Sequence, residues 1–317
     1  MLYFTITRVP QHWYNSPMVS IIIPFFNTGE SCAELVKQLL NDKVRDLEII
    51  CVDDNSTDDS LKKVREVAKK DKRVKVLHQE ENHGTATSRN RGLEEATGDY
   101  VVFLDSDDDV ADLFLSKMLE AISEEDTCLA VCGIRQNYLH SNKIVDKFTE
   151  PASPRRDGEK WEEYILRLMV EDAHLYSCVN KIYDMSVIKR GKVHFDVKLD
   201  FAEDTKFVLD YLKAAGDGEI NFVPDPLYTY NYGTPTSVVS ESSLRWENWE
   251  KNFADVKVFV GRNPSKHAQK LLKKLHLRFK ISHALAVARS KKSLREKIRC
   301  ENPFVLLGAK IIVLIRG

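Results

Sequence analysis

Runs of β-branched and other apolar residues alternate with segments of helical spacing through the first half of the chain. The runs have the continuous hydrophobicity of strands buried on both faces, and the segments between them repeat apolar residues every three or four positions. The expected strands are Val19–Phe25, Leu47–Val52, Val74–His78, Tyr100–Leu104 and Cys128–Cys132. The expected helices are Ala33–Leu40, Leu61–Lys70, Thr85–Ala96 and Leu113–Ile122. This alternation predicts an α/β fold with a mostly parallel sheet and helices on both faces.

The pattern is less regular in the second half. Residues 138–158 are polar and predict a loop or insertion. Beyond it we expect helices at Trp161–Val170 and Glu203–Ala214 and short strands at Ile220–Val223 and Leu227–Tyr232. From Leu244 onward the spacing is helical, and one apolar face is formed by Ala268, Leu271, Leu272, Leu275 and Phe279. The chain therefore divides into an N-terminal extension (1–17), an α/β domain (18–240) and a helical C-terminal region (241–317).

Charge is distributed unevenly along the 317 residues. The chain has a net charge of −1, yet residues 262–317 carry 15 Lys or Arg against two acids, a net charge of +13. The rest of the chain therefore carries −14. A basic region of this strength predicts an anionic partner, either a membrane surface or a phosphorylated molecule.

Short apolar segments bear on where the protein works. Residues 304–315 are apolar or small except for Lys310, and this stretch is too short to span a bilayer but long enough to lie in its interface. The N-terminus lacks the pattern of a signal peptide. The six cysteines form no CxxC pair and are expected to be reduced, mostly in the core. We expect a cytoplasmic protein, either free or peripheral on the inner face of the cell membrane.

Two acidic turns follow buried strands, where the ligands of parallel sheets bind. Four carboxylates crowd into Asp105–Asp109, and they repel one another unless a cation neutralises them. Carboxylate oxygens suit Mg²⁺ or Mn²⁺, which stabilise a departing diphosphate. The turn at Asp53-Asp54 offers acceptors for a base or a ribose. Solvated loops and helix caps are the alternative interpretation of both clusters.

A third element lies between these turns. Gly84 opens the expected helix at Thr85, whose N-terminal amides suit a phosphate. Arg89 adds a charge-assisted donor, although a surface ion pair would explain Arg89 equally well.

These pieces together resemble the family 2 glycosyltransferases of the GT-A fold. The resemblance covers about residues 19–122, through VSIIIPFFN, VDDNSTDDS and NHGTATSRNRGLEEATGDYVVFLDSDDD. It implies a Rossmann-like sheet with a nucleotide-binding half (18–135) and an acceptor half (136–240). It also implies an inverting transfer from a nucleotide-sugar donor of the UDP-sugar class, with Mn²⁺ or Mg²⁺ as cofactor. The implied nucleotide-binding residues are Pro24, Phe25, Asn27, Asp54, Arg89 and Asp105. Asp105 and Asp107 match the family's DxD pattern, which implies Asp107 as a metal ligand with Asp108 as a further candidate, and the sequence does not choose among the aspartates of 105–109.

The resemblance continues more faintly downstream. SCVNKIYD matches a segment where the family has Trp-Asn-Lys, with Val179 in place of the Trp, so Asn180 and Lys181 are implied acceptor or secondary residues. FAEDTKF matches the family's Glu-Asp motif, which makes Asp204 the implied catalytic base and Glu203 a secondary residue. A carboxylate there would deprotonate an acceptor hydroxyl as it attacks. A helix-terminal acid stabilised by the helix dipole is the alternative for Asp204.

The implied acceptor is a saccharide or a lipid-linked molecule, in surface polysaccharide synthesis. A catalytically weak sugar-nucleotide-binding subunit of a larger synthase is the alternative. A nucleotidyltransferase would need a Gly-rich loop after the first strand, where this chain has Pro24-Phe25-Phe26-Asn27. P-loop and GxGxxG motifs are missing, and no sequence feature indicates a nucleic-acid partner.

Overall fold

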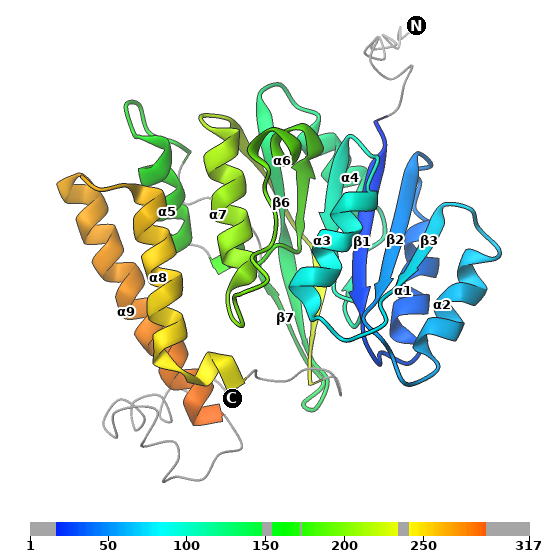
Figure 1. The fold of residues 1–317 in the computed structure, drawn as a ribbon. Coiled ribbons are helices and arrows are strands. Elements are labelled where there is room, and N and C mark those ends of the chain that lie inside the picture. Colours follow the sequence, from blue (N-terminus) through cyan, green and yellow to red (C-terminus); the bar gives the residue numbers. More distant parts are fainter. Residues whose placement is uncertain (1–16, 148–153, 172, 234–240, 290–317) are drawn as a thin grey trace, which may run out of the picture.

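A computed structural model describes residues 17–147, 154–171, 173–233 and 241–289. Its strands form one mixed sheet with the order β3-β2-β1-β4-β8-β6-β9-β5, and β7 pairs with β6 (Figure 1). The strands are β1 (Val19–Phe25), β2 (Leu47–Asp53), β3 (Val74–His78), β4 (Tyr100–Phe103), β5 (Asp109–Val110), β6 (Thr127–Tyr138), β7 (Lys143–Lys147), β8 (Lys181–Asp184) and β9 (Glu219–Tyr232).

The first four strands form the parallel part of the sheet. β1 lies between β2 and β4 and is parallel to both, and β3 extends β2 in the same direction. Every residue of β1 and β2 is buried, as their unbroken apolar sequences predict. Because β1 pairs Phe25 with Asp53, the loops after β1 and β2 emerge at the same edge.

The other half of the sheet mixes directions. β8 is antiparallel to both β4 and β6, whereas β6 and β9 run parallel over almost their whole length. β6 and β9 therefore run in the same direction as β1 to β4, and β8, between β4 and β6, runs opposite to them. β5 and β7 are antiparallel to their neighbours β9 and β6. An edge-to-face cluster of Phe103, Tyr183, Phe195 and Phe207 packs the two parts together.

The helices cover the sheet and add a bundle at one end. α1 (Ser31–Leu40) packs on α2 (Ser60–Ala68), α3 (Thr85–Glu95) on β1 and β2, and α4 (Phe114–Ile122) on β6, β8 and β9. α6 (Met185–Gly191) packs on α7 (Glu203–Ala215). α5 (Trp161–Glu171), α8 (Trp246–Val260) and α9 (Lys266–Arg289) gather beyond α7 (Figure 1). Short 3₁₀ turns lie at Ala173–Tyr176 and Glu241–Leu244.

The helical C-terminal region has the predicted apolar face. Ala268, Leu271, Leu275 and Phe279 are buried, and α9 packs through this face on α5 and α8. Among the described residues no helix is long and apolar enough to cross a bilayer. The apolar stretch 304–315 lies outside the described residues, as does Cys300, while the other five cysteines are free and buried.

One expectation is wrong. Residues 138–158 were expected to be irregular, but β6 continues to Tyr138 and turns back through β7. The register pairs Tyr138 with Lys143 and Ile134 with Lys147. Both faces of this hairpin carry polar side chains, so its sequence lacks the apolar alternation that reveals a half-buried strand.

Candidate active site

The predicted nucleotide-binding residues meet at one edge of the parallel sheet. Pro24 and Phe25 end β1 as buried residues. Asn27 follows in a left-handed conformation with φ of 51°. Its side-chain Oδ1 accepts hydrogen bonds from the backbone N–H groups of Thr57 (2.8 Å) and Asp58 (3.3 Å). Asn27 therefore fixes the turn after β2 against the end of β1.

Asp54 fixes a second loop at the same edge. Its carboxylate is buried and accepts hydrogen bonds from the N–H groups of His83 and Gly84, each at 2.8 Å, and from Gln79 Nε2 at 2.7 Å. Gly84, at φ of 84°, is the residue that opens α3. Asp54 thus orients the start of the helix that carries Arg89. Its neighbour Asp53 accepts from the Ser56 N–H and contacts His78 instead.

Arg89 bridges the two halves of the sheet. It projects from α3, its side chain is only 4% exposed, and its guanidinium lies 5.3 Å from the centre of the Phe195 ring. Nη2 donates to Asp105 at 2.7 Å, and Nη1 donates to Asp204 at 2.6 Å and lies 3.7 Å from Glu203. One buried cation therefore holds a carboxylate from the end of β4 beside two from the start of α7.

The acidic residues after β4 differ in their surroundings. Asp108 is buried, accepting hydrogen bonds from the Tyr228 hydroxyl and from the Asn231 N–H, the latter at 2.8 Å. Burial and repulsion from Asp105 raise its pKa to about 8. Asp107 is partly exposed and Asp109 fully so. The carboxylates that face outward therefore belong to Asp107 and Asp109, and Asp105 faces Arg89.

Glu203 and Asp204 form the first turn of α7. The turn is preceded by Ala202 in a left-handed conformation with φ of 62°. Asp204 Oδ2 accepts weak hydrogen bonds from Ser177 Oγ at 3.4 Å and the Cys178 N–H at 3.5 Å. Burial and repulsion from Asp204 raise the pKa of Glu203 to about 7, against the attraction of Arg89.

Asn180 and Lys181 lie next to this turn but face inward. Both are fully buried. Asn180 Nδ2 donates to the Cys132 carbonyl at 2.5 Å, and Lys181 Nζ donates to Asn180 Oδ1 at 2.9 Å and to the Ser177 carbonyl at 2.7 Å. Their side chains thus shape the loop that carries Cys178 rather than reaching the surface.

Sequence reasoning missed several partners of the predicted residues. Gln79, Ser177, Phe195, Tyr228 and Asn231 contact them from other elements. Tyr228 lies 120 positions from Asp108 in the chain, so no local spacing links the two. The signal in the sequence was the tyrosine at every second position of Leu227–Tyr232, which fits a pattern that often follows the family's Glu-Asp motif.

The sequence predicts a divalent cation at the acidic cluster after β4. The described residues include no group of three His, Cys, Asp or Glu side chains that would cage a metal. Mg²⁺ commonly binds through one or two carboxylates together with substrate phosphates. Asp107, whose carboxylate faces outward, offers one such hard oxygen ligand, while Asp105, two residues away, is paired with Arg89.

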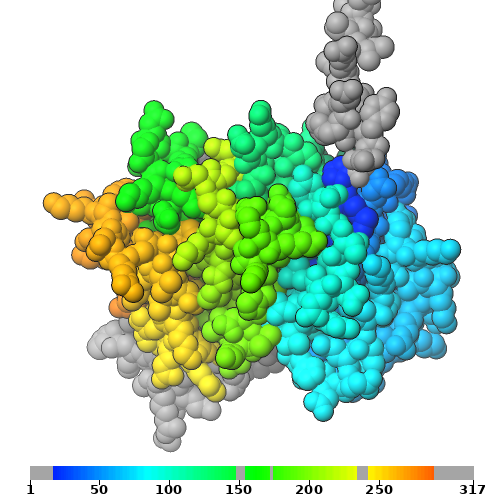
Figure 2. Space-filling model, turned by 45° about the horizontal axis from the view of Figure 1, so that its top comes forward, coloured from blue at the N-terminus to red at the C-terminus, as the bar shows by residue number. Residues whose placement is uncertain are grey.

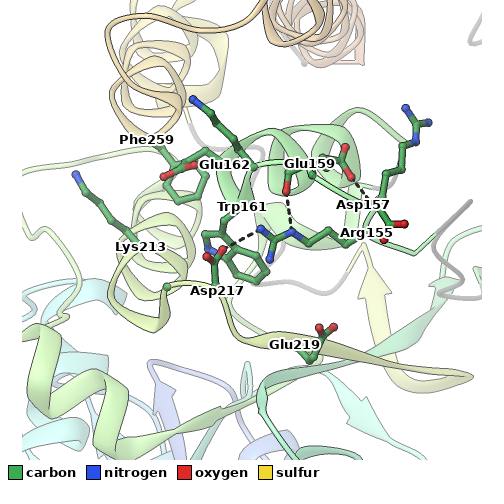
Figure 3. Close-up of a pocket in the computed structure, with 13 residues that line it drawn as sticks. Arg155, Asp157, Glu159, Trp161, Glu162, Lys213, Asp217, Glu219 and Phe259 are labelled. Carbon is green, nitrogen blue, oxygen red and sulfur yellow. Dashed lines mark hydrogen bonds and ion pairs between the residues drawn. The ribbon is translucent and has the colours of Figure 1, made fainter.

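A pocket of about 670 Å³ lies elsewhere, at the opposite end of β9 (Figure 3). Within it, Arg155 donates to Asp217 at 2.9 Å and stacks over Trp161, 5.7 Å from the ring centre. No predicted site residue lines it. We place the active site at the acidic edge, because the carboxylates there converge on one buried cation.

Comparisons with known proteins identify the family of the chain. The family model described as glycosyl transferase family 2 matches residues 20–191. The chain is 32% identical over 217 residues to EpsH of Bacillus subtilis, covering 68% of this chain and 61% of EpsH. It is 29% identical over 234 residues to the glycosyltransferase GlyG of Streptococcus pneumoniae, covering 73% and 76%. It is 38% identical over 109 residues to the GalNAc(5)-diNAcBac-PP-undecaprenol beta-1,3-glucosyltransferase of Campylobacter jejuni, covering 34% and 35%.

Solved structures share the fold. Staphylococcus aureus TarS (residues 1–349), crystallised with UDP-GlcNAc, superposes with a TM-score of 0.62 at 20% identity, covering 91% of this chain and 82% of that one. The mannosyltransferase PcManGT of Pyrobaculum calidifontis, in complex with GDP-Man and Mn²⁺, gives a TM-score of 0.59 at 17% identity, covering 94% and 87%. These likenesses show the GT-A arrangement.

Proposed function

This chain belongs to glycosyl transferase family 2, and on that premise we propose that it transfers a sugar from a UDP-sugar to a hydroxyl of a saccharide or lipid-linked acceptor, with inversion. The observation that carries the proposal is the Arg89 bridge. It holds Asp105, at the predicted nucleotide site, and Asp204, the predicted base, on one guanidinium with contacts of 2.7 and 2.6 Å. The distance between the residue proposed to bind the donor and the proposed base is thereby fixed before either substrate binds.

In this proposal the nucleotide binds on a surface formed by Pro24, Phe25, Asn27 and Asp54. Asn27 and Asp54 hold the loops at 56–58 and 79–84, so the nucleotide meets a preformed edge. Asp105 and Arg89 then lie at the donor's ribose and phosphates. TarS, which shares the fold, was crystallised with UDP-GlcNAc, and this supports the UDP class.

We propose Asp107 and Asp108 as ligands of Mn²⁺ or Mg²⁺, with Asp105 alongside. A bound cation would neutralise charge on the departing diphosphate. Asp107 is the more accessible of the pair, since both oxygens of Asp108 already accept hydrogen bonds from Tyr228 and Asn231. PcManGT, of the same fold, was crystallised with Mn²⁺.

On the acceptor side, Asp204 takes the proton of the attacking hydroxyl. Arg89 favours the ionised, proton-accepting form of Asp204, because an opposite charge at 2.6 Å stabilises a carboxylate. Glu203 lies in the same turn, and Asn180 and Lys181 shape the loop beside it. These three residues therefore influence Asp204 indirectly, through the turn and the loop that surround it.

The relatives support the proposed acceptor and pathway. The Campylobacter jejuni relative is named for an acceptor carried on undecaprenol diphosphate. We therefore propose a role in surface polysaccharide synthesis on the cytoplasmic face of the membrane. The basic C-terminal region would meet anionic lipid there, since α9 contains no acidic residue and exposes Lys266, Lys270, Lys273, Lys274 and Lys280.

A ligand screen tests the proposal. Thermal unfolding is measured with a panel of UDP-, GDP- and dTDP-sugars, each with Mn²⁺ and with EDTA. A UDP-sugar at one hundred times its Kd should stabilise the protein by about 2.7 kcal/mol, and EDTA should remove most of this. Slow hydrolysis of the same donor distinguishes an enzyme from a binding subunit. If no sugar nucleotide raises the melting temperature, the proposal is overturned.

A further inference from the structure

The ribbon formed by the last halves of β6 and β9 carries aromatic rings on one face. β6 and β9 pair in register here, Gln136 opposite Tyr230 and Tyr138 opposite Tyr232. Because paired residues share a face and neighbours in a strand alternate, these four side chains lie on one side. Asn137, Asn231 and Ile144 lie on the other.

The three tyrosines, Tyr138, Tyr230 and Tyr232, form a continuous row that we call the tyrosine stripe. The rings of Tyr138 and Tyr232 stack at 4.7 Å with an angle of 8°, and Tyr230 contacts Tyr232 at 4.5 Å. Gln136 donates to the Tyr232 hydroxyl at 3.1 Å and accepts from Tyr138 at 3.2 Å. These contacts fix the rings, and Tyr232 remains 37% exposed.

The stripe begins at the acidic cluster. In β9, Tyr228 donates its hydroxyl to Asp108, and Tyr230 follows two residues later on the same face of the strand. The next residue, Asn231, donates its N–H to Asp108 and its Nδ2 to Asp109, both at 2.8 Å. The stripe therefore leads outward from the carboxylates that face the proposed donor.

We propose that the tyrosine stripe binds pyranose rings of a saccharide acceptor next to the sugar that is extended. The proposal rests on the proposed function and names the acceptor class. A pyranose ring combines C–H groups with hydroxyl groups, and a row of tyrosines offers the matching combination of apolar ring area and polar hydroxyls. Gln136 and the phenol groups lie where sugar hydroxyls need partners.

A hydrocarbon chain fits this surface less well. Covering the stripe with lipid would desolvate the tyrosine hydroxyls and the Gln136 amide without giving them new partners, which is unfavourable. Rigid tyrosines with adjacent amides bind polar ligands at low entropic cost. The stripe thus favours a saccharide, even if that saccharide is itself carried on a lipid.

Saturation-transfer NMR on the full-length protein, without nucleotide, tests this. The probes are hexamers of pyranose sugars: maltohexaose, cellohexaose, chitohexaose and β-1,6-linked glucosamine. We expect at least one to bind, and Tyr232→Ala to weaken that binding about tenfold, while Tyr232→Phe keeps the ring and binds within threefold of the wild type. Ile144→Ala is the matched control: it removes an exposed apolar residue, 62% exposed, from the opposite face of the same ribbon and should change nothing.

Two results would overturn the proposal. Either no hexamer binds the wild-type protein, or Tyr232→Ala and Ile144→Ala bind the same hexamer equally well. Because the measurement uses no donor, it is independent of the sugar-nucleotide screen. If a saccharide binds but no sugar nucleotide does, the proposed function is rejected and the role of the tyrosine stripe is kept. If a sugar nucleotide binds but no saccharide does, only the role of the stripe is rejected.

Discussion

Arg89 is the residue on which the two halves of the site depend. Its sequence context allowed either a nucleotide contact or a surface ion pair. In the structure it is buried among Asp105, Glu203 and Asp204, which come from elements 16 to 115 positions away. A buried cation among carboxylates is costly to remove, because each carboxylate left behind loses its partner.

Removing this cation should destabilise the protein strongly. We expect Arg89→Ala to lower the free energy of unfolding by about 3–5 kcal/mol, measured by urea denaturation at pH 7. Arg91→Ala is the control on the same helix. Arg91 is half exposed and paired only with Glu94 and Glu95, so its loss should cost less than about 1 kcal/mol. Equal effects of the two substitutions would contradict the bridging role.

The raised pKa of Glu203 predicts a pH-dependent stability. Its pKa is about 7 in the folded protein against an ordinary 4.5. The folded state holds this proton more tightly, so the stabilisation present below pH 4.5 is lost as the pH rises towards 7 and beyond. The Glu203→Gln variant has no ionisable group at this position, so it does not lose this stabilisation as the pH rises. Its stability relative to the wild type should be about 2 kcal/mol more favourable at pH 8 than at pH 5.

Urea denaturation at the two pH values measures this. The exposed Glu120 provides the control, because Glu120→Gln should shift stability equally at both. A Glu203→Gln variant whose stability relative to the wild type does not change with pH would show that Glu203 ionises normally.

At the scale of elements, most of the fold was predictable and part of the site was not. β1 and β2 follow from their apolar runs, and the site residues at their ends follow from the rule that ligands bind at the carboxyl ends of parallel strands. β7, β8 and the far half of β6 were missed. β8 is only four residues long, and the β6–β7 hairpin is polar on both faces. Such strands are recognised by their pairing partners, which a single sequence does not reveal.

The approach of α3 to β1 depends on Gly92. A Cβ built on Gly92 would lie 2.4 Å from Ile22 Cγ2, in the centre of the sheet. Gly92→Ala should therefore destabilise the protein by about 1–3 kcal/mol through overpacking. In a double-mutant cycle measured by urea denaturation, Ile22→Ala should cost less in the Gly92→Ala background than in the wild type. Additive costs would mean that α3 shifts freely to accommodate the methyl group.

At the scale of the whole molecule, charge is separated between the site and the far end of the helical bundle. α9 packs its apolar face on α5 and α8 and exposes its lysines together with Leu277 and Ile281, which are 59% and 42% exposed. In Figure 2 the helical bundle, in yellow to orange, lies at the opposite end of the surface from the blue strands of the nucleotide half. Donor binding and surface attachment would thus use different ends of the molecule.

Vesicle binding tests this separation. We expect the full chain to sediment with vesicles of 70% phosphatidylcholine and 30% phosphatidylglycerol, and not with pure phosphatidylcholine. Replacing Lys270, Lys273, Lys274 and Lys280 by Gln should weaken sedimentation markedly, since each lysine near an anionic surface contributes about 1 kcal/mol. The control variant replaces Lys62, Lys69 and Lys70 by Gln. These lysines lie on the distant α2 and the turn after it. Equal sedimentation of both sets would place the attachment elsewhere.

The most direct test of the account is Asp204→Asn, assayed for donor binding and for transfer in the same preparation. Asparagine keeps an oxygen that accepts from Arg89 Nη1 but is too weak a base to take the acceptor's proton. We predict that UDP-sugar affinity changes by less than about threefold while the transfer rate falls by a factor on the order of 10²–10⁴, as loss of a general base requires. Transfer at the wild-type rate would contradict the assignment of Asp204 and with it the catalytic geometry built on the Arg89 bridge.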